Sequence, residues 1–457
     1  MPGLIETYEQ ALEYLFGRIN YERLHSQEYT AGDFKLDRMR RLLELLGNPH
    51  ERLPAVHITG TKGKGSTAVM LAGVLSATGL RVGLFTSPHI THFEERMTVA
   101  GVRPSPEQVV ALVNQLIEPV ATLDQAPGAN PTYFEITTAM AWLYFVQQGA
   151  DCVVLEVGLG GRLDATNVCN PAVCIITTIA RDHTHLLGSE LSQIAREKGG
   201  IIKAGVPLVS GVLQPEPRDT IADICTERGA SRIQLERDFT YTDAGGPTAP
   251  WSRIDVRLSR RSLNDIPVPL LGAHQAHNAA LAVAAADELV QAGWSISDEA
   301  LRAGMSQVRW PARVEVVAEH PTVVVDAAHN WTSIAALIDT LRKSFRPRAK
   351  VLIFAATRDK DVLGMLRQLL PEFDTVILTC YLNNPRTVPV EQLLQMVRSI
   401  STTPVHAADD PATALKLARR FAGPDDLICT TGSFFIAAEI RELIIERNEV
   451  RSDALRV

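Results

Sequence analysis

The segment Thr59-Gly-Thr-Lys-Gly-Lys-Gly-Ser-Thr67 constrains the fold more than any other part of this sequence. It follows a short apolar run, residues 55–58, and precedes a stretch whose apolar residues have helical spacing. Glycines let the backbone curl so that several N–H groups converge on an anion, and the helix N-terminus adds a partial positive charge. Lys64 supplies a point charge for nucleotide phosphates. The segment therefore predicts a phosphate-binding loop between a strand and a helix.

The spacing departs from the standard phosphate-binding pattern. That pattern places a glycine where Ile58 stands and a hydroxyl directly after the lysine, where Gly65 stands. The match is therefore to a shorter variant, Gly-x-x-Gly-Lys-x-Ser. A glycine-rich turn without a ligand is the alternative, and the two lysines placed among the glycines argue against it.

Short β-rich apolar runs alternate with helical periods along the chain, which predicts an α/β fold with helices on both faces of a parallel sheet. The predicted strands are residues 55–58, 81–86, 151–157, 173–179, 207–212, 322–326, 350–355, 375–379 and 427–430. The predicted helices include residues 67–78, 277–292 and 332–345 and one that begins near Ser433. Between about residues 234 and 269, the turn cluster at 243–250 predicts a small antiparallel subsheet.

Pro311 cannot continue a helix, so the segment Arg309-Trp-Pro-Ala-Arg313 predicts a hinge. We therefore expect an N-terminal P-loop ATP-binding domain over residues 1–308 and a smaller Rossmann-like α/β domain over residues 309–457.

Charge and cysteine content narrow the class of protein. The 457 residues carry 45 Lys and Arg against 52 Asp and Glu, a net charge of −7, which favours neither a nucleic-acid nor a membrane partner. The six cysteines form no Cys-x-x-Cys pair and fit a reducing compartment. No signal peptide and no membrane span is recognisable. We expect a soluble cytoplasmic protein.

Two further segments carry side chains suited to metal binding. Glu156 ends an apolar run, where a carboxylate is costly unless it is paired or bound to a metal. An ion pair with Arg162 is the alternative. His183 and His185 follow a predicted strand, at the edge where ligands of such sheets bind, although an isolated histidine is more often structural. Periodicity alone predicts that Lys198 is a solvated helix lysine.

A set of motifs in fixed order resembles folylpolyglutamate synthase and its bifunctional dihydrofolate synthase form, within the Mur ligase superfamily. The resemblance covers nearly the whole chain. The motifs are Gly60-Thr-Lys-Gly-Lys-Gly-Ser66, Thr86-Ser-Pro-His89, Tyr133-Phe-Glu-Ile136, Leu155-Glu-Val-Gly-Leu-Gly-Gly-Arg-Leu-Asp-Ala-Thr166, Asp182-His-Thr-His-Leu-Leu-Gly188, His277-Asn278, Asp326-Ala-Ala-His-Asn330 and Thr431-Gly-Ser433.

The resemblance implies a nucleotide site and two Mg²⁺ ions. The residues implied for ATP are Lys62, Gly63, Lys64, Gly65, Ser66, Asn278, Arg313 and Asp326, the last three from both sides of a domain gap. Ser87 and Glu156 would hold one Mg²⁺, and His183 the second. Lys198 matches a lysine that is carbamylated in this family, and a carbamate is a carboxylate-like metal ligand.

The resemblance also implies substrate positions and a reaction. The pterin side would involve Thr132, Tyr133, Phe134, Glu135, Leu163, Asp164 and Ala165, and the glutamate side would involve His329 and Ser433 in a C-terminal glutamate-ligase domain. Lys64, Lys198 and His329 would be catalytic. The expected reaction is ATP-dependent addition of L-glutamate to a folate, and also to dihydropteroate in the bifunctional form, through an acyl phosphate, by a monomer.

Two residues depart from the family pattern. Lys62 stands where the family has Asn, which adds a charge beside the phosphates, and Ala312 stands where the hinge normally has Gly. Two alternatives remain open at this level: a cell-wall muramyl ligase acting on a UDP-sugar, and a P-loop module that binds ATP without ligating anything.

Overall fold

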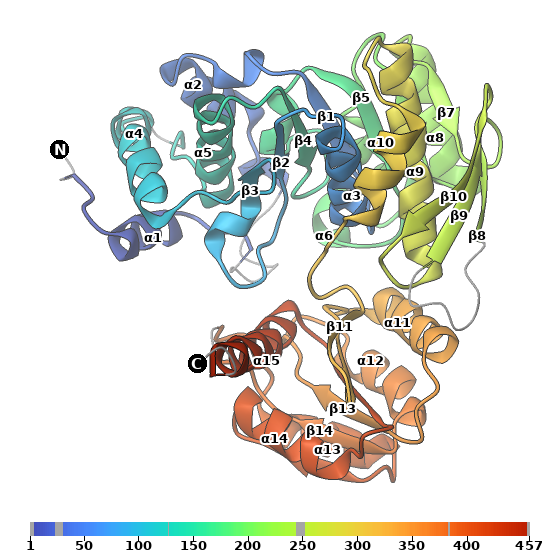
Figure 1. The fold of residues 1–457 in the computed structure, drawn as a ribbon. Coiled ribbons are helices and arrows are strands. Elements are labelled where there is room, and N and C mark those ends of the chain that lie inside the picture. The colour runs from blue at the N-terminus through green and yellow to red at the C-terminus, as the bar shows by residue number, and fades with distance from the viewer. Residues whose placement is uncertain (1–3, 23–30, 127, 244–251, 383, 455–457) are drawn as a thin grey trace. The chain divides into compact units, whose positions relative to one another are not determined.

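The computed structural model describes residues 4–22, 31–126, 128–243, 252–382 and 384–454, which form two compact units (Figure 1). The first unit contains the chain up to residue 243 together with Arg253–Val268 and Gln275–Val308. The second contains the chain from Arg309 onward and also the short segment Pro269–His274. The predicted second domain, residues 309–457, does not include this short segment. It belongs to the second unit because its Leu271 packs against that unit's core.

A seven-stranded sheet forms the centre of the first unit, in the order β3-β2-β4-β1-β5-β6-β7. All neighbours are parallel except the edge strand β3, which is antiparallel to β2. The strands are β1 (Ala55–Thr59), β2 (Val82–Phe85), β3 (Met97–Val99), β4 (Cys152–Glu156), β5 (Pro171–Ile176), β6 (Leu208–Ser210) and β7 (Arg232–Gln234). β1 and β4 are buried along their whole length, as expected for central parallel strands covered on both faces.

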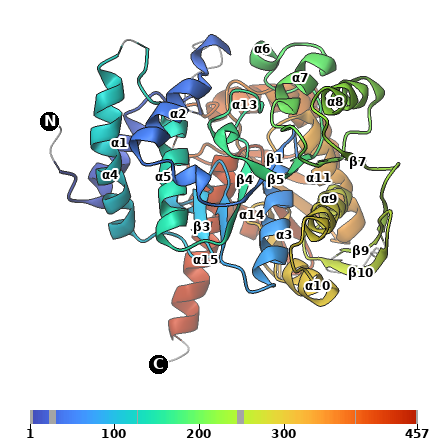
Figure 2. The same ribbon diagram turned by 90° about the horizontal axis from the view of Figure 1, so that it is seen from above.

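Helices cover both faces of this sheet, as the alternating pattern predicts. In Figure 2, α3 and α10 lie on one side and α7 and α8 on the other. The helices α1, α2, α4 and α5 pack together beside β3 and β2 around one apolar cluster. The α-helices of this unit are α1 (Tyr8–Phe16), α2 (Leu36–Leu45), α3 (Lys64–Ser76), α4 (Pro106–Asp124), α5 (Tyr133–Gln147), α6 (Thr184–Leu187), α7 (Leu191–Gly199), α8 (Pro215–Glu227), α9 (Ala273–Gln291) and α10 (Asp298–Ser306).

The predicted small subsheet is present and has three strands in the order β10-β9-β8, with β8 antiparallel to β9. Its strands are β8 (Thr240–Asp243), β9 (Ser252–Arg257) and β10 (Ser262–Val268). The predicted turn at residues 243–250 lies outside the described residues apart from its first position. Short 3-10 helices complete the first unit: η1 (Ala31–Asp33), η2 (Pro49–Glu51), η3 (Phe93–Arg96) and η4 (Ala165–Val168).

The second unit is a six-stranded sheet in the order β11-β12-β16-β13-β14-β15, parallel except for the edge strand β11. Its elements are β11 (Glu315–Ala318), β12 (Thr322–Val325), α11 (Trp331–Ser344), β13 (Lys350–Phe354), α12 (Val362–Leu369), η5 (Leu370–Glu372), β14 (Thr375–Leu378), α13 (Val390–Ile400), β15 (Val405–Ala407), α14 (Pro411–Phe421), β16 (Leu427–Thr431) and α15 (Phe434–Ala454). The predicted strands of this half agree with β12, β13, β14 and β16 to within one residue.

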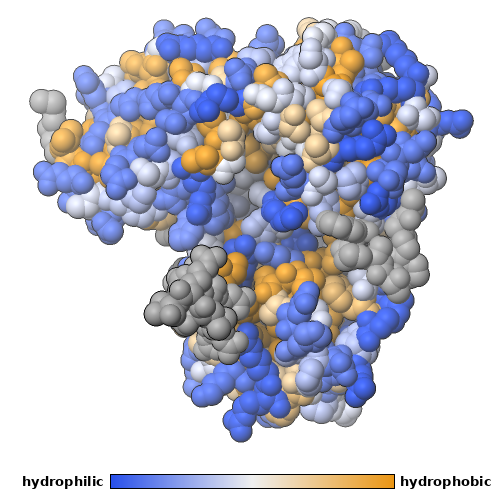
Figure 3. Space-filling model, in the orientation of Figure 1, coloured by the Kyte–Doolittle hydropathy of each residue, from blue (hydrophilic) through white to orange (hydrophobic). Residues whose placement is uncertain are grey.

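Three further features of the structure concern the polarity of its surface, the apolar character of the helices and the state of the cysteines. Figure 3 shows hydrophilic residues over much of the visible face of the first unit, with apolar residues scattered among them. None of the described helices combines the length and the apolar character that a membrane crossing requires. All six cysteines are free thiols, and five of them are buried.

Candidate active site

The predicted phosphate-binding loop joins β1 to α3, and its glycines have conformations that side chains disfavour. Gly63 caps α3 with φ +87°, so the helix begins at Lys64, three residues before the predicted start. A Cβ on Gly63 would lie 2.2 Å from Oδ1 of Asn278, and a Cβ on Gly60 would lie 1.8 Å from Oγ1 of Thr177. Glycine is therefore required at both positions. Asn278, predicted to contact the nucleotide, lies directly against this loop.

Two lysines from different helices meet at the loop. The Nζ of Lys64 and the Nζ of Lys198 both donate to the carbonyl oxygen of Gly60, at 3.3 and 3.0 Å. Lys198 is only 4% exposed, so the prediction of a solvated lysine from periodicity is wrong. The last turn of α7 turns this side chain inward, under the loop. The pKa of Lys198 is lowered from 10.5 to about 7, chiefly by burial and secondly by the nearby Lys64, whereas Asp182 acts in the opposite direction.

Lys62 is tied to the segment that follows β5. Its backbone carbonyl accepts hydrogen bonds from the hydroxyls of Thr177 and Thr178, at 2.6 and 3.2 Å. Its Nζ forms an ion pair with Asp182 at 2.9 Å, and both side chains are about one-third exposed. The charge that departs from the family pattern is therefore balanced by a carboxylate. It also links the phosphate loop to the segment that carries His183.

Glu156 lies at the carboxyl end of β4, beside Ile58 of β1 in the parallel register. It is 5% exposed and accepts a hydrogen bond from the backbone N–H of Ser87 at 3.1 Å. Two of the predicted metal ligands are thus adjacent. Arg162 pairs with Glu197 at 2.9 Å, so the alternative that Arg162 is the partner of Glu156 is wrong.

His183 precedes α6 in a left-handed conformation, φ +48°, and its side chain is half-exposed. Its Nε2 lies 3.8 Å from Asp182, and its ring centroid lies 6.4 Å from that of His185. Within the part of the chain that the structure describes, no three His, Cys, Asp or Glu side chains converge on one point as a metal cluster. Any cation here needs ligands of other kinds as well.

Of the seven residues predicted at the pterin side, Thr132, Tyr133 and Glu135 stabilise the start of α5 through contacts within the protein. Glu135 forms an ion pair with Arg38 at 2.7 Å and completes a capping box with Thr132 at the start of α5. Tyr133 is 1% exposed, and its ring stacks on Phe16 with centroids 5.5 Å apart. The segment is therefore a rigid helix start.

Phe134, which lies in the same segment, is half-buried beside the chain that leaves β4. Its ring lies 5.9 Å from that of Phe85, and a Cβ on Gly158 would approach it to 2.5 Å. Leu163, Asp164 and Ala165 come from the same stretch of chain, and Leu163 is half-buried, whereas the other two are buried. Burial raises the pKa of Asp164, and hydrogen bonds from Thr166, Leu159 and Gly158 act against that rise.

In the second unit, Asp326 secures the predicted hinge. Its two carboxylate oxygens accept backbone N–H groups of Val314 and Ala328, at 2.9 and 2.8 Å. Ala312 and Val314 both have left-handed backbones, with φ of +52° and +49°. The position where the family has glycine is thus one that favours glycine. Burial raises the pKa of Asp326, and Arg313 opposes that rise.

His329 and Ser433 lie on neighbouring segments, because Gly432 donates its N–H to the carbonyl of Ala328 at 3.0 Å. Phe434 connects this region to the hinge: the guanidinium of Arg313 lies 4.7 Å from its ring centroid, and the ring of His329 lies 5.8 Å away. The sequence reasoning missed Phe434, and also His57, Arg38 and Asp182. His57, Asp182 and Phe434 lie in or close to the recognised motifs, whereas no sequence pattern marks Arg38.

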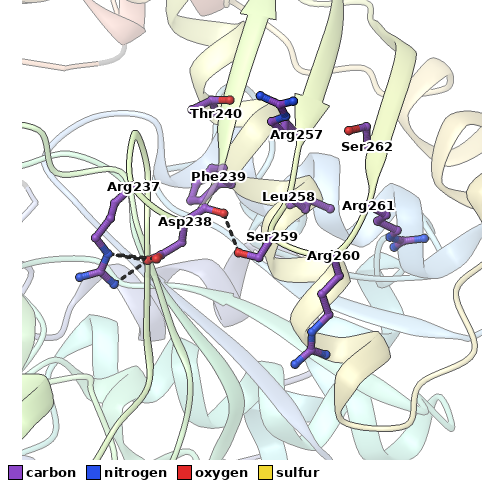
Figure 4. A pocket seen from close by; sticks show the side chains of 10 residues that line it. All are labelled: Arg237, Asp238, Phe239, Thr240, Arg257, Leu258, Ser259, Arg260, Arg261 and Ser262. Atoms are coloured by element: carbon purple, nitrogen blue, oxygen red, sulfur yellow. Dashed lines mark hydrogen bonds and ion pairs between the residues drawn. The ribbon is translucent and has the colours of Figure 1, made fainter.

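A separate basic hollow lies over the three-stranded sheet and contains none of the predicted site residues (Figure 4). Its four arginines, Arg237, Arg257, Arg260 and Arg261, point in different directions. Three of them already have partners. Arg237 pairs with Asp238, Arg260 binds Gln291, and Arg261 pairs with both Asp287 and Asp298. The hollow therefore does not present a convergent anion site.

Comparison with known proteins gives consistent matches. The Mur ligase middle domain matches residues 58–286, and the Mur ligase glutamate ligase domain matches residues 312–434. The dihydrofolate synthase/folylpolyglutamate synthase of Bacillus subtilis is 35% identical over 441 residues, which cover 96% of this chain and 99% of that protein.

Solved structures of such enzymes are similar over almost the entire chain. Mycobacterium tuberculosis folylpolyglutamate synthase, complexed with ADP and AMPPCP, has a TM-score of 0.86 and 33% identity, covering 96% of this chain and 98% of that one. Escherichia coli FolC, in complex with DHPP and ADP, has a TM-score of 0.84 and 30% identity, covering 98% and 100%.

Proposed function

Because the chain belongs to the Mur ligase family and, within it, to the folylpolyglutamate and dihydrofolate synthases, we propose that the residues around Gly60 carry the ATP-dependent half of its reaction. The chain is an ATP-dependent ligase that adds L-glutamate to a folate. The observation that carries the assignment of residues is the convergence of Lys64 and Lys198 on one carbonyl of the phosphate loop.

The reaction proceeds in two steps. A carboxylate oxygen of the pterin substrate attacks the γ-phosphorus of ATP, which forms an acyl phosphate and releases ADP. The neutral amine of L-glutamate then attacks the acyl carbon, a proton leaves the nitrogen, and phosphate departs. Because carboxylate and triphosphate are both anionic, cations must screen their approach.

Lys62, Gly63, Lys64, Gly65 and Ser66 bind the phosphates. The free N–H groups at the start of α3 and the ammonium of Lys64 supply fixed positive charge where negative charge develops. Asn278 in the first unit, and Arg313 and Asp326 in the second, contact the nucleotide. The close approach of Asn278 to Gly63 supports this role for Asn278. The position of Arg313 over the ring of Phe434 supports the same role for Arg313.

The reaction would need two Mg²⁺ ions. Ser87 and Glu156 would hold one, and His183 with a carbamylated Lys198 would hold the second. The oxygen donors of Ser87 and Glu156 fit Mg²⁺, which is commonly bound by one or two carboxylates together with substrate phosphates. When bound, the ions would supply positive charge that stabilises the anionic phosphate groups.

Lys198 is suited to carbamylation because the reaction with CO₂ needs a neutral amine. At its usual pKa of about 10.4 a lysine is almost fully protonated at neutral pH. With its pKa lowered to about 7 by burial, a large fraction of Lys198 is neutral there. Lys64 and Lys62 also favour the carbamate anion once it has formed.

The organic substrates bind through two groups of residues. Thr132, Tyr133, Phe134, Glu135, Leu163, Asp164 and Ala165 form the pterin side, and His329 and Ser433 form the glutamate side. His329 acts on the incoming amine: its Nδ1–H donates to the carbonyl of Ala327 at 3.0 Å, which leaves Nε2 as the basic nitrogen. We take the enzyme to act as a monomer.

Product analysis tests the function. Purified protein with Mg-ATP and glutamate is incubated with tetrahydrofolate, with dihydropteroate or with a UDP-muramyl substrate, and the products are identified by mass spectrometry. We expect glutamate to be added to both pterins. Addition to tetrahydrofolate alone would mean a monofunctional enzyme. Addition only to the UDP-muramyl substrate, or ATP hydrolysis without ligation, would contradict the assignment.

A further inference from the structure

Three buried polar side chains form a continuous hydrogen-bonded row beneath the predicted pterin side. The Nε2 of His57, in β1, lies 2.8 Å from Oγ1 of Thr166, in η4. That hydroxyl lies 2.5 Å from Oδ1 of Asp164. His57 and Thr166 are both 0% exposed, and Asp164 is 5% exposed. The row connects the strand that leads into the phosphate loop with the turn that carries Asp164.

The direction of the hydrogen bonds follows from counting protons. A hydroxyl has one hydrogen to donate. The short contact with the carboxylate is the charge-assisted one, so Thr166 donates to Asp164. The hydroxyl must then accept from His57, which places the imidazole proton on Nε2. The other nitrogen, Nδ1, is buried and has no hydrogen-bond partner among the described residues.

The carboxylate of Asp164 is held from three directions. Oδ1 accepts the hydroxyl and also the backbone N–H of Thr166, at 3.0 Å, and Oδ2 accepts the N–H of Leu159 at 2.9 Å. These hydrogen bonds thus fix the orientation of a carboxylate that is only 5% exposed.

β1 holds the same turn by a second side chain. The hydroxyl of Thr59 donates to the carbonyl of Gly160 at 2.6 Å. Residues two apart on a strand point to the same face, so His57 and Thr59 both reach this turn. Thr59 is followed directly by Gly60 of the phosphate loop.

We propose that His57 is a positioning residue for the folate: acting through Thr166, it fixes the carboxylate of Asp164 and so aligns the pterin side with the phosphate loop. This inference rests on the proposed contact between Asp164 and the pterin. Since Nδ1 of His57 is left without a partner, an apolar residue would suit the core better unless the Nε2–H contact serves a purpose. A neutral imidazole is required, and burial keeps the pKa of His57 near 3.

Four variants separate positioning from packing. Thr166→Val and His57→Leu keep the volume nearly unchanged but break the row, whereas Thr166→Ser and His57→Gln keep a hydroxyl and an N–H donor. We expect the first pair to raise KM for folate about tenfold, as for loss of one charge-assisted hydrogen bond, with KM for ATP unchanged. The second pair should restore most of the affinity for folate.

The matched control is Thr340→Val. Thr340 is also buried, at 1% exposure, but its hydroxyl donates to the carbonyl of Ala336 within its own helix, α11. It should leave both KM values unchanged. If Thr166→Val and His57→Leu lower the thermal stability and change KM for folate no more than Thr340→Val does, His57 only fills the core and the proposal is overturned.

A measurement without turnover separates this inference from the proposed function. Nitrogen-15 NMR of histidine-labelled wild-type protein reports the tautomer of His57, whose signal is the one lost in His57→Gln. We expect neutral imidazole with the proton on Nε2 between about pH 5 and 8. A proton on Nδ1, or a charged ring, overturns the row even if folate is ligated normally. The expected tautomer without ligation of any folate would contradict the proposed function instead.

Discussion

Lys64 and Lys198 donate to the same acceptor, the carbonyl oxygen of Gly60, although one residue starts α3 and the other lies in the last turn of α7. Two neighbouring amines repel each other when both are protonated. The pKa of the buried one, Lys198, is the one that is lowered. Lys64, the proposed phosphate-binding residue, therefore favours the neutral form of Lys198. This arrangement links the phosphate site to the proposed carbamylation site through one backbone atom.

Replacement of the phosphate lysine should abolish ligation. We expect Lys64→Ala to lower kcat by about a thousandfold or more, because a cation that stabilises the transition state is worth on the order of several kcal/mol. Initial rates of ADP formation measure this, and circular dichroism checks the fold. Lys343→Ala, which removes an exposed ion pair on α11, is the control and should be fully active. Near-wild-type turnover of well-folded Lys64→Ala would remove the residue from the mechanism.

Lys198 should be replaceable only by a carboxylate. We expect Lys198→Ala to be inactive and to regain part of its activity with formate or acetate, since a short acid can occupy the space of a carbamate. Lys198→Arg, which stays charged, should not be rescued. The observation that would refute carbamylation is an unmodified side chain in crystals grown near pH 8 with bicarbonate and Mg-ATP, combined with full activity of Lys198→Ala.

Metal dependence should change when either proposed ligand is removed. Glu156→Gln keeps an acceptor for the N–H of Ser87, so the fold should persist while the charge is lost. We expect Glu156→Gln and His183→Ala each to shift the Mg²⁺ titration of the rate to higher concentration and to lower its plateau. Glu299→Gln, a change on the exposed start of α10, serves as control. An unchanged titration would make the residue concerned structural.

The carboxylate of Asp326 at the hinge should contribute to the stability of the second unit, in addition to its proposed contact with the nucleotide. Asp326→Asn replaces one acceptor oxygen by an NH₂ group facing a backbone N–H, so a buried donor loses its partner. We expect the second unit to lose about 1 to 3 kcal/mol of unfolding free energy, measured by calorimetry. Asp339→Asn on the half-exposed side of α11 should change it by less than about 0.5 kcal/mol. Equal effects of the two would contradict the hinge role.

His57 should make the protein sensitive to acid. Its pKa is lowered from 6.5 to about 3 in the folded state, so between these values the unfolded chain binds more protons than the folded one. Stability attributable to His57 is therefore complete above about pH 6.5 and falls with acidity by up to about 1.4 kcal/mol per pH unit. His57→Gln should lose this part of the pH dependence in urea unfolding at pH 7, 6 and 5. Parallel curves for the two proteins would show that the ring is accessible to protons.

Much of the fold follows from local pattern. A central parallel strand is apolar throughout, so β1, β4 and β13 are recognisable from a few residues each. Helix boundaries are less local. α3 begins at Lys64 because Gly63 adopts a left-handed conformation against Asn278, a residue more than two hundred positions later in the sequence.

The features of the site also fall into those that follow from local sequence and those that depend on tertiary packing. The sequence by itself determined that a glycine-rich loop joins β1 to a helix and that polar residues such as Glu156 lie where parallel strands end, because both depend on patterns within a few residues. Only the tertiary structure decided that Lys198 is buried, that Glu135 binds Arg38 and that His57 reaches Asp164 through Thr166. Burial and ion pairing depend on which distant segments pack together. Periodicity describes one element's own faces and says nothing of what another element brings to them.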